Sequence, residues 1–296
     1  MRVLVTGATG FIGGALLRNA PADWDIAAVA RSGRPASASA AAAVEWVEAD
    51  LCEPGFERRL PAATDVVVHL AQARAASGFP ASARELVDLN VIATARLLEH
   101  AHASGAGRFV LASTGTIYRP REEPLDEDAP LDCDSFYSAS KRSAELLARP
   151  YGALLGCHVL RLFTVYGDGQ EGRLIPNLVA RVRAGDAVTV QGRHGLLLSP
   201  VHVDDVAAAL IAAVSGPGRG FEITNVGGPD VLGIREIAEI LGRIVGREPR
   251  IEAAAGDELG GFAADITKLS RTLAIAPPRR FEDGAAQAFA SRGAVA

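Results

Sequence analysis

A tyrosine and a lysine stand four residues apart in the segment Tyr137-Ser138-Ala139-Ser140-Lys141. On a helix, such a pair shares one face, about one turn apart. A tyrosine hydroxyl titrates at about 10 in water, which is too high for easy proton exchange at neutral pH, and a nearby ammonium group favours the phenolate. The pair therefore predicts acid–base chemistry by Tyr137 with Lys141 as its electrostatic partner, although an ordinary exposed helix pair has the same spacing.

Hydroxyl side chains follow an apolar run upstream of this pair, in Leu111-Ala112-Ser113-Thr114-Gly115-Thr116-Ile117-Tyr118. The carboxyl end of a parallel strand faces the ligand crevice of an open α/β sheet. One of these hydroxyls can therefore hold a substrate oxygen against Tyr137, although each could instead cap a turn. Together the segments predict proton transfer at a carbinol or ketone.

Three glycines spaced three apart, Gly7, Gly10 and Gly13, lie between an apolar run and a helix predicted to begin near Phe11. Gly7 allows a tight turn, Gly10 lets the backbone approach a pyrophosphate, and Gly13 lets helix and strand pack closely. The helix N-terminus then presents free N–H groups and partial positive charge to the phosphates. A glycine-rich turn without a ligand is the alternative, but the position between strand and helix favours a bound dinucleotide.

The segment Ala30-Arg31-Ser32-Gly33-Arg34 follows the second apolar run, where the adenosine ribose of a dinucleotide is expected. Enzymes that use NAD usually place Asp or Glu there, and this segment contains no acid. Arg31 would attract the 2′-phosphate of NADP through charge-assisted hydrogen bonds, or it could stack on adenine or point to water. The sequence favours NADP, with NAD possible. Asp50, after the third run, could accept a bond from the adenine amino group or cap a helix.

The segments that carry these residues alternate between short apolar runs and helical stretches. Runs of Val, Ile and Leu without polar alternation suit strands buried on both faces. The runs are residues 3–5, 26–29, 44–47, 66–70, 109–111 and 159–163, and the clearest helices are 81–103 and 135–148; a loop is expected at 32–43. This rhythm predicts an α/β fold, a Rossmann-type doubly wound parallel sheet with helices on both faces.

The rhythm changes after residue 167. Helices are predicted at 174–184, 204–214 and 234–245, and strands at 187–190 and 221–224. We therefore expect two domains: residues 1–167 as the dinucleotide-binding domain, and residues 168–296 as a smaller mixed α/β lobe that contacts the substrate, with room for some of its elements to return to the first domain.

The bulk composition excludes several classes of protein. The net charge is −5, and no basic surplus points to nucleic acid or to a membrane surface. No apolar stretch is long enough to span a bilayer, and none reads as a leader. The three cysteines are scattered, which favours a reducing cytoplasm. No two of the six histidines stand four apart, so no metal site is predicted.

With these motifs in order, the chain resembles the extended branch of the short-chain dehydrogenase/reductase superfamily, in its sugar-nucleotide epimerase/dehydratase group. The resemblance covers nearly the whole chain. Its segments are residues 6–14, 50–51, 68–71, 90–91 with Thr94, 113–118, 137–141, 161–167 and 202–205.

The resemblance implies the following roles. Thr114 is the catalytic hydroxyl, Ser113 supports it, Tyr137 is the acid/base and Lys141 tunes Tyr137 and binds the nicotinamide ribose. Asn90 shapes the site near that ribose. The remaining cofactor contacts are Gly7, Thr9, Gly10, Phe11, Ile12, Gly13, Arg31, Ser32, Asp50, Leu51, Leu70, Ala71, Leu162 and Phe163. His69, at the end of a strand, is expected to be structural.

Two positions depart from the pattern of members that bind nucleoside diphosphate sugars. Thr164 replaces the usual asparagine after the sixth strand, and Leu198 stands where an arginine is common. Both usual residues help to bind the diphosphate, and Arg173, Arg193 or His194 could substitute for them. Thr164, Arg173 and Arg193, with Thr114, are therefore the predicted substrate contacts.

The favoured function is an NADP(H)-preferring reductase that converts a ketone to an alcohol, on a keto-deoxysugar nucleotide or a keto metabolite of similar size. The alternative is a nucleotide-sugar 4-epimerase that keeps NAD tightly bound. A dehydratase is less favoured because Gly115 and Thr116, rather than acids, follow Thr114. A non-catalytic dinucleotide sensor is disfavoured because Tyr137 and Lys141 are both present. The resemblance also implies a homodimer paired through helices 81–103 and 135–148.

Overall fold

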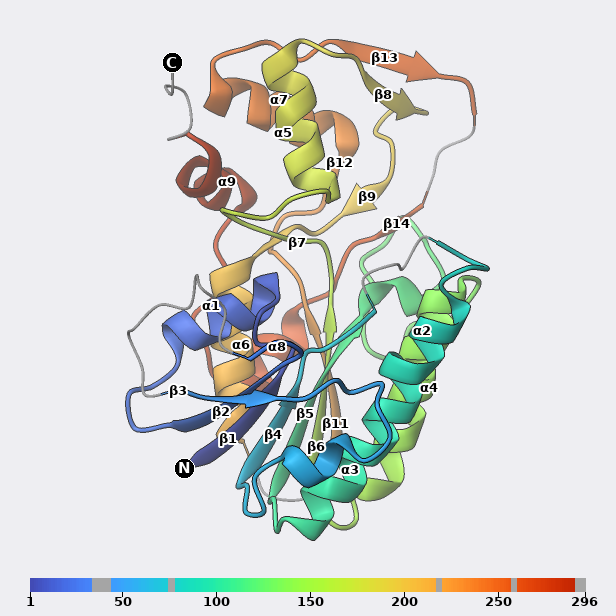
Figure 1. Ribbon diagram of the computed structural model, residues 1–296. Coiled ribbons are helices and arrows are strands. Elements are labelled where there is room, and N and C mark those ends of the chain that lie inside the picture. Colours follow the sequence, from blue (N-terminus) through green and yellow to red (C-terminus); the bar gives the residue numbers. More distant parts are fainter. Residues whose placement is uncertain (34–43, 74–77, 217–219, 257–259, 291–296) are drawn as a thin grey trace. The chain divides into compact units, whose positions relative to one another are not determined.

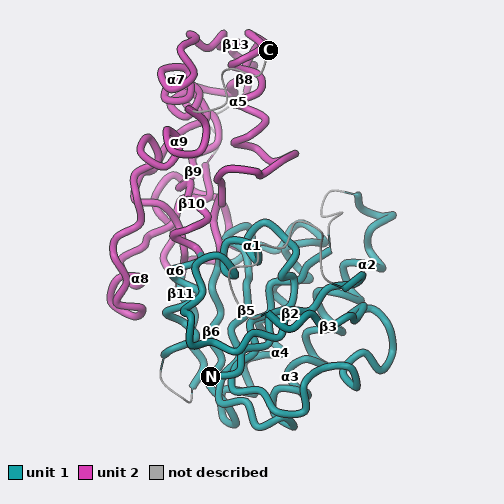
Figure 2. Tube along the Cα trace, turned by 60° about the vertical axis from the view of Figure 1, so that its left-hand side comes forward, with its two compact units in different colours: residues 1–117, 131–161, 207–224 teal, residues 118–130, 162–206, 225–296 magenta. Residues whose placement is uncertain are grey.

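The computed structural model describes residues 1–33, 44–73, 78–216, 220–256 and 260–290, so the loop expected at 32–43 lies almost wholly outside the described residues. The chain forms two compact units, coloured separately in Figure 2. Unit 1 comprises Met1–Ile117, Leu131–Arg161 and Ala207–Thr224, and unit 2 comprises Tyr118–Pro130, Leu162–Val206 and Asn225–Ala296. Each predicted domain is one continuous segment, divided after residue 167, whereas each unit of the structure comprises three separate segments of the chain.

A seven-stranded sheet forms the centre of unit 1 (Figure 1). Its order is β11-β6-β5-β4-β1-β2-β3, and the pairs that join β5, β4, β1, β2 and β3 are parallel. The strands are β1 (Arg2–Thr6), β2 (Asp25–Ala30), β3 (Val44–Glu48), β4 (Val66–His69), β5 (Arg108–Thr114), β6 (Gly156–Leu162) and β11 (Phe221–Val226). All six predicted runs are strands of this sheet, and the predicted Rossmann-type fold is confirmed.

Helices cover the sheet on both faces, with α2, α3 and α4 on one face and α1 on the other in Figure 1. Their bounds are α1 (Phe11–Asn19), α2 (Ala83–Val87), α3 (Ala93–Ala103), α4 (Phe136–Tyr151) and α6 (Val203–Val214), with short turns η1 (Phe56–Arg59) and η3 (Gly115–Ile117). An apolar core fills the space between the strands and the α3/α4 layer, including Leu97, Phe109 and Ala144.

Two local features fix the helices that carry the predicted site. Ser135 and Ser138 form a capping box, in which each side chain accepts from the other residue's backbone N–H, and this starts α4 at Phe136. The predicted helix 81–103 corresponds to α2 and α3, which are joined without a break by a π-helical turn, η2 (Asp88–Ile92). Such turns are frequent at functional sites, and this one carries Asn90.

Unit 2 has its own apolar core, built around Tyr166, Leu178, Ile237 and Phe281. Its helices are α5 (Leu174–Ala184), α7 (Ile234–Val245), α8 (Thr267–Leu273) and α9 (Phe281–Phe289). Its strand pairs are β7 (Val165–Tyr166) with β10 (Val201–His202), β8 (Val188–Gln191) with β13 (Ile251–Ala254), and β9 (Leu197–Leu198) between β12 (Leu232–Gly233) and β14 (Gly261–Phe262).

The predicted helices 174–184 and 234–245 are α5 and α7, and the predicted strand 187–190 is β8. The strand predicted at 221–224 is β11, which pairs with β6 at the edge of the large sheet. The sequence predicted this strand but not its neighbour β6, because sheet order across a long connection is not a local property.

Candidate active site

The glycine-rich turn joins β1 to α1 and lies against the end of β4. Gly7 has a φ of +69°, and a Cβ there would lie 2.6 Å from the Ala71 backbone nitrogen. A Cβ on Gly13 would lie 2.2 Å from the Gly7 carbonyl oxygen. A Cβ on Gly10 meets only that carbonyl, at 3.1 Å, so the space in front of Gly10 is otherwise open. No acid occupies the first turn of α1, so this cradle fits a dinucleotide pyrophosphate.

A buried chain of hydrogen bonds runs from this turn through His69. The Thr6 hydroxyl lies 2.7 Å from His69 Nδ1, and His69 Nε2 lies 3.0 Å from the Thr94 hydroxyl. Thr94 donates to the Asn90 carbonyl, and Thr6 accepts from the Ala71 N–H. Each hydroxyl has one proton, so His69 carries its proton on Nε2 and accepts at Nδ1. Burial, with the charge of Lys141, lowers the pKa of His69 to about 3, so the ring is neutral.

Asn90 continues the chain towards α4. It is buried, accepts from the Ala73 N–H at 3.2 Å, and donates to the Ser140 hydroxyl at 3.0 Å. Ser140 in turn donates to the Tyr137 carbonyl at 2.8 Å. The π-helical turn that carries Asn90 is therefore joined directly to the helix that carries Tyr137 and Lys141.

Tyr137 and Lys141 lie one turn apart on α4, as predicted, but in different environments. The Tyr137 hydroxyl donates to the Gln72 side-chain oxygen at 3.0 Å. Lys141 is buried, and its Nζ donates to the Ala112 carbonyl of β5 at 2.7 Å. Burial lowers the pKa of Lys141 to about 8, while the charge of Glu145 opposes this shift. The ammonium is thus held against the end of β5 while the phenol faces a polar side chain.

The two hydroxyls at the end of β5 are held in different ways. Thr114 Oγ1 lies 3.0 Å from the Thr116 hydroxyl and accepts from the Thr116 N–H. Ser113 donates to the carboxylate of Glu145 at 2.5 Å. Ser113 is therefore turned towards α4, and Thr114 towards the η3 turn.

The adenosine end of the predicted cofactor site is more open. Arg31 and Ser32 follow β2 and are exposed. Asp50 accepts from the Cys52 N–H at 2.9 Å and so closes a turn, and Leu51 is buried in the core. Asp50 does not cap a helix, because the next helix, η1, begins at Phe56 with Gly55 before it, so the capping alternative is wrong. The second oxygen of the Asp50 carboxylate is available to a ligand.

The predicted contacts that follow β6 along the chain belong to unit 2. Leu162 and Phe163 are buried, and Thr164 is half-buried and accepts from the Val201 N–H through its carbonyl. Arg173 precedes α5 and is exposed, as is Arg193. Leu198 is buried in the unit 2 core, where an arginine could not replace it without repacking.

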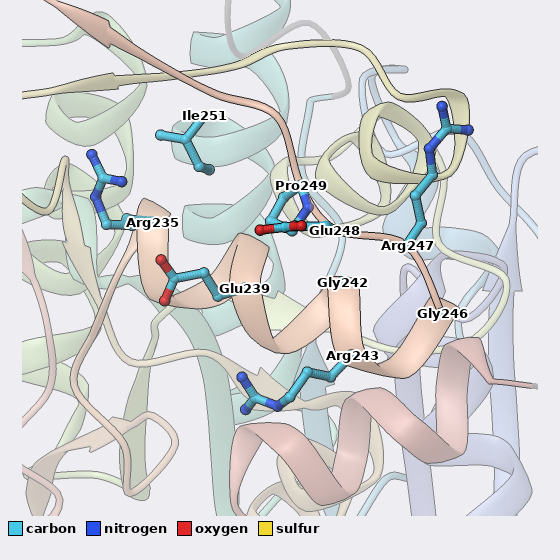
Figure 3. A pocket seen from close by; sticks show the side chains of 9 residues that line it. All are labelled: Arg235, Glu239, Gly242, Arg243, Gly246, Arg247, Glu248, Pro249 and Ile251. Atoms are coloured by element: carbon cyan, nitrogen blue, oxygen red, sulfur yellow. The ribbon is translucent and has the colours of Figure 1, made fainter.

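A separate pocket of about 740 Å³ lies in unit 2 beside α7 (Figure 3). It is lined by Arg235, Glu239, Gly242, Arg243, Gly246, Arg247, Glu248, Pro249 and Ile251. None of these residues is a predicted site residue, and their charges are used locally: Arg243 pairs with Glu282, and Arg247 donates to the Arg183 carbonyl.

Two residues of unit 1 that contact the predicted site were not singled out from the sequence. Gln72 bonds Tyr137, and Glu145 bonds Ser113. Glu145 stands four residues after Lys141 on the same helix, so its position was a readable signal. Gln72 follows the end of β4 by three residues, and only the fold brings it to α4.

Within the described residues, no helix is long and apolar enough to cross a membrane. No cluster of three or more His, Cys, Asp or Glu side chains suited to a metal ion occurs in that same part of the chain.

Comparison with known proteins places these features in a family. The model of the NAD dependent epimerase/dehydratase family matches residues 3–227. A dTDP-glucose 4,6-dehydratase from Streptomyces griseus is 32% identical over 97% of this chain and 93% of its own length. A UDP-glucuronate 4-epimerase from Thermodesulfobacterium geofontis is 33% identical over 74% and 69%, and a dTDP-4-dehydro-6-deoxy-D-allose reductase from Streptomyces bikiniensis is 29% identical over 93% and 91%.

Solved structures that are similar to this chain include proteins with the same kinds of ligand and activity. MoeE5 in complex with UDP-glucose and NAD matches with a TM-score of 0.83 and 28% identity, over 97% of both chains. DesIV, a dTDP-glucose 4,6-dehydratase from Streptomyces venezuelae with NAD bound, matches with a TM-score of 0.82 and 30% identity, over 97% of this chain and 95% of that one. The chain therefore belongs to the NAD dependent epimerase/dehydratase family, within the extended short-chain dehydrogenase/reductase superfamily, and is an NAD(P)-dependent enzyme.

Proposed function

We propose that this enzyme reduces a ketone to an alcohol on a keto-deoxysugar nucleotide or a keto metabolite of similar size. The observation that carries the proposal is the juxtaposition, within unit 1, of Tyr137 and Lys141 on α4 with the end of β5 that carries Thr114. A relative named as a dTDP-keto-sugar reductase supports it.

The nicotinamide, when bound, supplies hydride to the carbonyl carbon. Tyr137 gives its hydroxyl proton to the carbonyl oxygen, and Thr114 holds that oxygen by a hydrogen bond. Lys141 stabilises the negative charge that this transfer leaves on Tyr137 and holds the nicotinamide ribose. A proton from solvent then restores Tyr137, so that ketone, reduced cofactor and one proton give alcohol and oxidised cofactor. Before the substrate binds, the Tyr137 hydroxyl donates to Gln72, and the substrate oxygen would replace Gln72 as the acceptor.

For the cofactor, Gly7, Thr9, Gly10, Phe11, Ile12 and Gly13 would hold the pyrophosphate, and Asp50, Leu51, Leu70, Ala71 and Asn90 would line the path to the nicotinamide, with Leu162 and Phe163 meeting its carboxamide. We propose NADP(H) as the preferred cofactor because the exposed Arg31 follows β2 where NAD enzymes usually carry an acid. The structural relatives bind NAD, so use of NAD is the alternative.

The similarity to dehydratases has to be weighed against the site itself. Loss of water from a sugar needs an acid and a base beyond Tyr137, and such acids are expected directly after the catalytic threonine. Here Gly115 and Thr116 follow Thr114, and the Thr116 hydroxyl is bonded to Thr114 at 3.0 Å. The local chemistry favours reduction over dehydration.

A nucleotide-sugar 4-epimerase is the second candidate, because a relative named as an epimerase is 33% identical. Such an enzyme oxidises and re-reduces one carbon on a retained NAD. Native mass spectrometry of the purified enzyme separates the two: retained NAD favours the epimerase, and weakly held NADP favours the reductase. Consumption of NADPH with a dTDP-4-keto-6-deoxysugar tests the reductase directly, and it also excludes a dinucleotide sensor without catalysis.

The substrate is proposed to contact Thr114 together with Thr164, Arg173 and Arg193 of unit 2. We also propose a cytoplasmic homodimer that pairs through the α2–α3 and α4 helices. Large apolar side chains on those helices, Ile92 at 48% and Leu146 at 50% exposure, support this pairing. Analytical ultracentrifugation of the wild type and of Leu146→Glu tests it: the substitution should yield monomer.

A further inference from the structure

A cluster of charged side chains lies where α4 packs against strands β5 and β6, and the proposed reaction does not use it. Glu145 is fully buried, and its carboxylate accepts from Arg161 Nε at 3.1 Å and from Arg161 Nη2 at 2.9 Å. Arg161, from β6, is also buried. Arg142 adds a third donor to the same carboxylate at 2.8 Å.

The carboxylate is turned towards the reacting groups as well as towards the two arginines. Glu145 accepts from the Ser113 hydroxyl, and Ser113 stands between Ala112, which accepts from Lys141, and Thr114. Glu145 also lies one turn after Lys141 on α4. One buried anion therefore meets adjacent residues of β5 and faces the buried ammonium from its own helix.

An ion pair alone does not need this arrangement. A buried pair is weak evidence for stability, because desolvation of two charges offsets their attraction. The further contact to Ser113 and the position beside Lys141 are unexplained by packing, and they point to the reaction.

We propose that Glu145 is a positioning residue that, held by Arg161, fixes the end of β5 through Ser113 and keeps Lys141 in its charged form. This inference rests on the proposed role of Lys141. The groups that face Lys141 are Tyr137 and Glu145 on α4 and the neutral His69 on β4, while Arg142 and Arg161 act through Glu145. Burial favours the neutral amine, and the Glu145 carboxylate is the charge that opposes this, since the arginines hold its own pKa below the usual value against the effect of burial.

The test measures the dissociation constant of NADPH, by fluorescence, between pH 6 and 10. In the wild type, affinity should weaken above pH 8, where Lys141 loses its proton. Glu145→Gln should move this weakening about one pH unit lower, the scale of an opposite charge at close range. Arg142→Gln is the matched control: it removes a partner of the same carboxylate from the same helix but keeps the anion, so the weakening should not move to lower pH.

Glu145→Gln leaves Arg161 buried without its partner, and this variant could fail to fold. The double variant Glu145→Gln/Arg161→Met removes both charges and keeps the core neutral. It should fold, and its NADPH affinity should weaken at the same lower pH as that of Glu145→Gln. Wild-type pH dependence in the folded double variant overturns the charge effect.

The second half of the proposal has its own readout. Ser113→Ala cuts the link to β5 while leaving the charge at Glu145. The NADPH dissociation constant and its pH dependence should stay unchanged, and kcat should fall by up to about a hundredfold, the scale of a displaced catalytic group. Unchanged kcat overturns the positioning through Ser113. Lys141→Met separates the two levels of inference: if it keeps the wild-type pH dependence, the proposed role of Lys141 fails, whatever Glu145 does.

Discussion

Two ion pairs, one from each unit, differ in how deeply their side chains are buried. In unit 1, Arg161 and Glu145 pair with 2% and 0% of their side chains exposed. In unit 2, Arg243 and Glu282 pair with 59% and 56% exposed. Breaking one side of a buried pair costs about 3–5 kcal/mol, whereas an exposed pair contributes about 0–1 kcal/mol. The Arg161–Glu145 pair is thus fixed beside the Tyr137–Lys141 helix, whereas the Arg243–Glu282 pair can change with little effect on folding.

The same contrast appears in the neutral polar groups. In unit 1, one chain of hydrogen bonds joins Thr6, His69, Thr94, Asn90 and Ser140, and each side chain in it is buried. In the described residues of unit 2, the strands form three small sheets, with pairings as short as two residues. A buried hydrogen-bond network around the reacting groups suits an enzyme whose reaction chemistry is fixed. Short strand pairings elsewhere suit substrate contacts that differ between proteins of one fold.

The largest expected effect concerns the proton donor of unit 1. Tyr137→Phe removes only the hydroxyl that now donates to Gln72. Turnover should fall by roughly two to four powers of ten, the usual contribution of positioned acid–base catalysis, with cofactor affinity nearly unchanged. Steady-state kinetics on the true substrate with an NADPH binding titration measure both. Near-full activity would mean that the proton comes from another group.

Two companion variants make that pattern specific. Lys141→Met should damage turnover and cofactor binding together, because Lys141 has two proposed roles. Thr114→Val should lower turnover and leave cofactor binding alone, since its hydroxyl is assigned only to the substrate oxygen. Equal losses in all three variants would indicate general disruption of unit 1 instead of separate roles.

The next effect is on folding. Arg161→Met should lower the free energy of unfolding by about 3–5 kcal/mol, because the Glu145 carboxylate stays buried without its main partner. Urea unfolding followed by circular dichroism measures this. The double variant with Glu145→Gln should recover most of the loss. A loss below about 1 kcal/mol for Arg161→Met alone would show that the pair behaves like an exposed one, and the contrast between the units would not hold.

More of unit 1 than of unit 2 could be predicted from the sequence. Buried parallel strands read as apolar runs such as 66–70 and 159–163, and the glycines of residues 7–13 stand at fixed spacing, so the sheet and the cofactor turn of unit 1 were predictable. The hydrogen-bond partners of His69 could not be predicted, because Thr6 and Thr94 come from segments far apart in sequence. In unit 2, helices α5 and α7 show clear periodicity, but a two-residue strand such as β7 has no periodicity to detect.

The third effect concerns the exposed edge of the proposed cofactor site. Arg31→Asp should weaken NADP(H) relative to NAD(H) by about 1.5–3 kcal/mol, because a carboxylate would face the 2′-phosphate and would suit free ribose hydroxyls. Arg31→Gln removes the charge without adding an acid, so its ratio of NADP(H) to NAD(H) dissociation constants should lie between those of the wild type and Arg31→Asp. Titration with both cofactors measures the ratio of dissociation constants. A ratio that stays the same in both variants would mean that Arg31 does not touch the phosphate.

The fourth effect is a dependence of stability on pH that arises from the buried chain of unit 1. The pKa of His69 is about 3 in the folded protein and about 6.5 when unfolded, so the unfolded chain binds one more proton between these values. Stability from this group is therefore complete above pH 6.5 and is lost as the pH falls towards 3, by up to about 1.4 kcal/mol per pH unit. His69→Gln should show a shallower decline between pH 6 and 4.5 in urea titrations. An unchanged slope would assign the acid sensitivity to other groups.

The smallest effect is expected at the exposed pair of unit 2. Arg243, from the pocket beside α7, lies 3.0 Å from the carboxylate of Glu282 at the start of α9, and both side chains are more than half exposed. Arg243→Ala should change the free energy of unfolding by less than about 1 kcal/mol, because solvent screens the pair and holding two long side chains in place costs entropy. A double-mutant cycle with Glu282→Ala isolates the coupling between the two, which should be about 0.2–1 kcal/mol and should shrink in 1 M salt. Turnover should stay at the wild-type level, since none of the groups assigned to the reaction contacts this pair. A coupling as large as that of Arg161 with Glu145 would mean that exposure does not decide what an ion pair contributes in this protein, and the contrast between the two pairs would have to be given up.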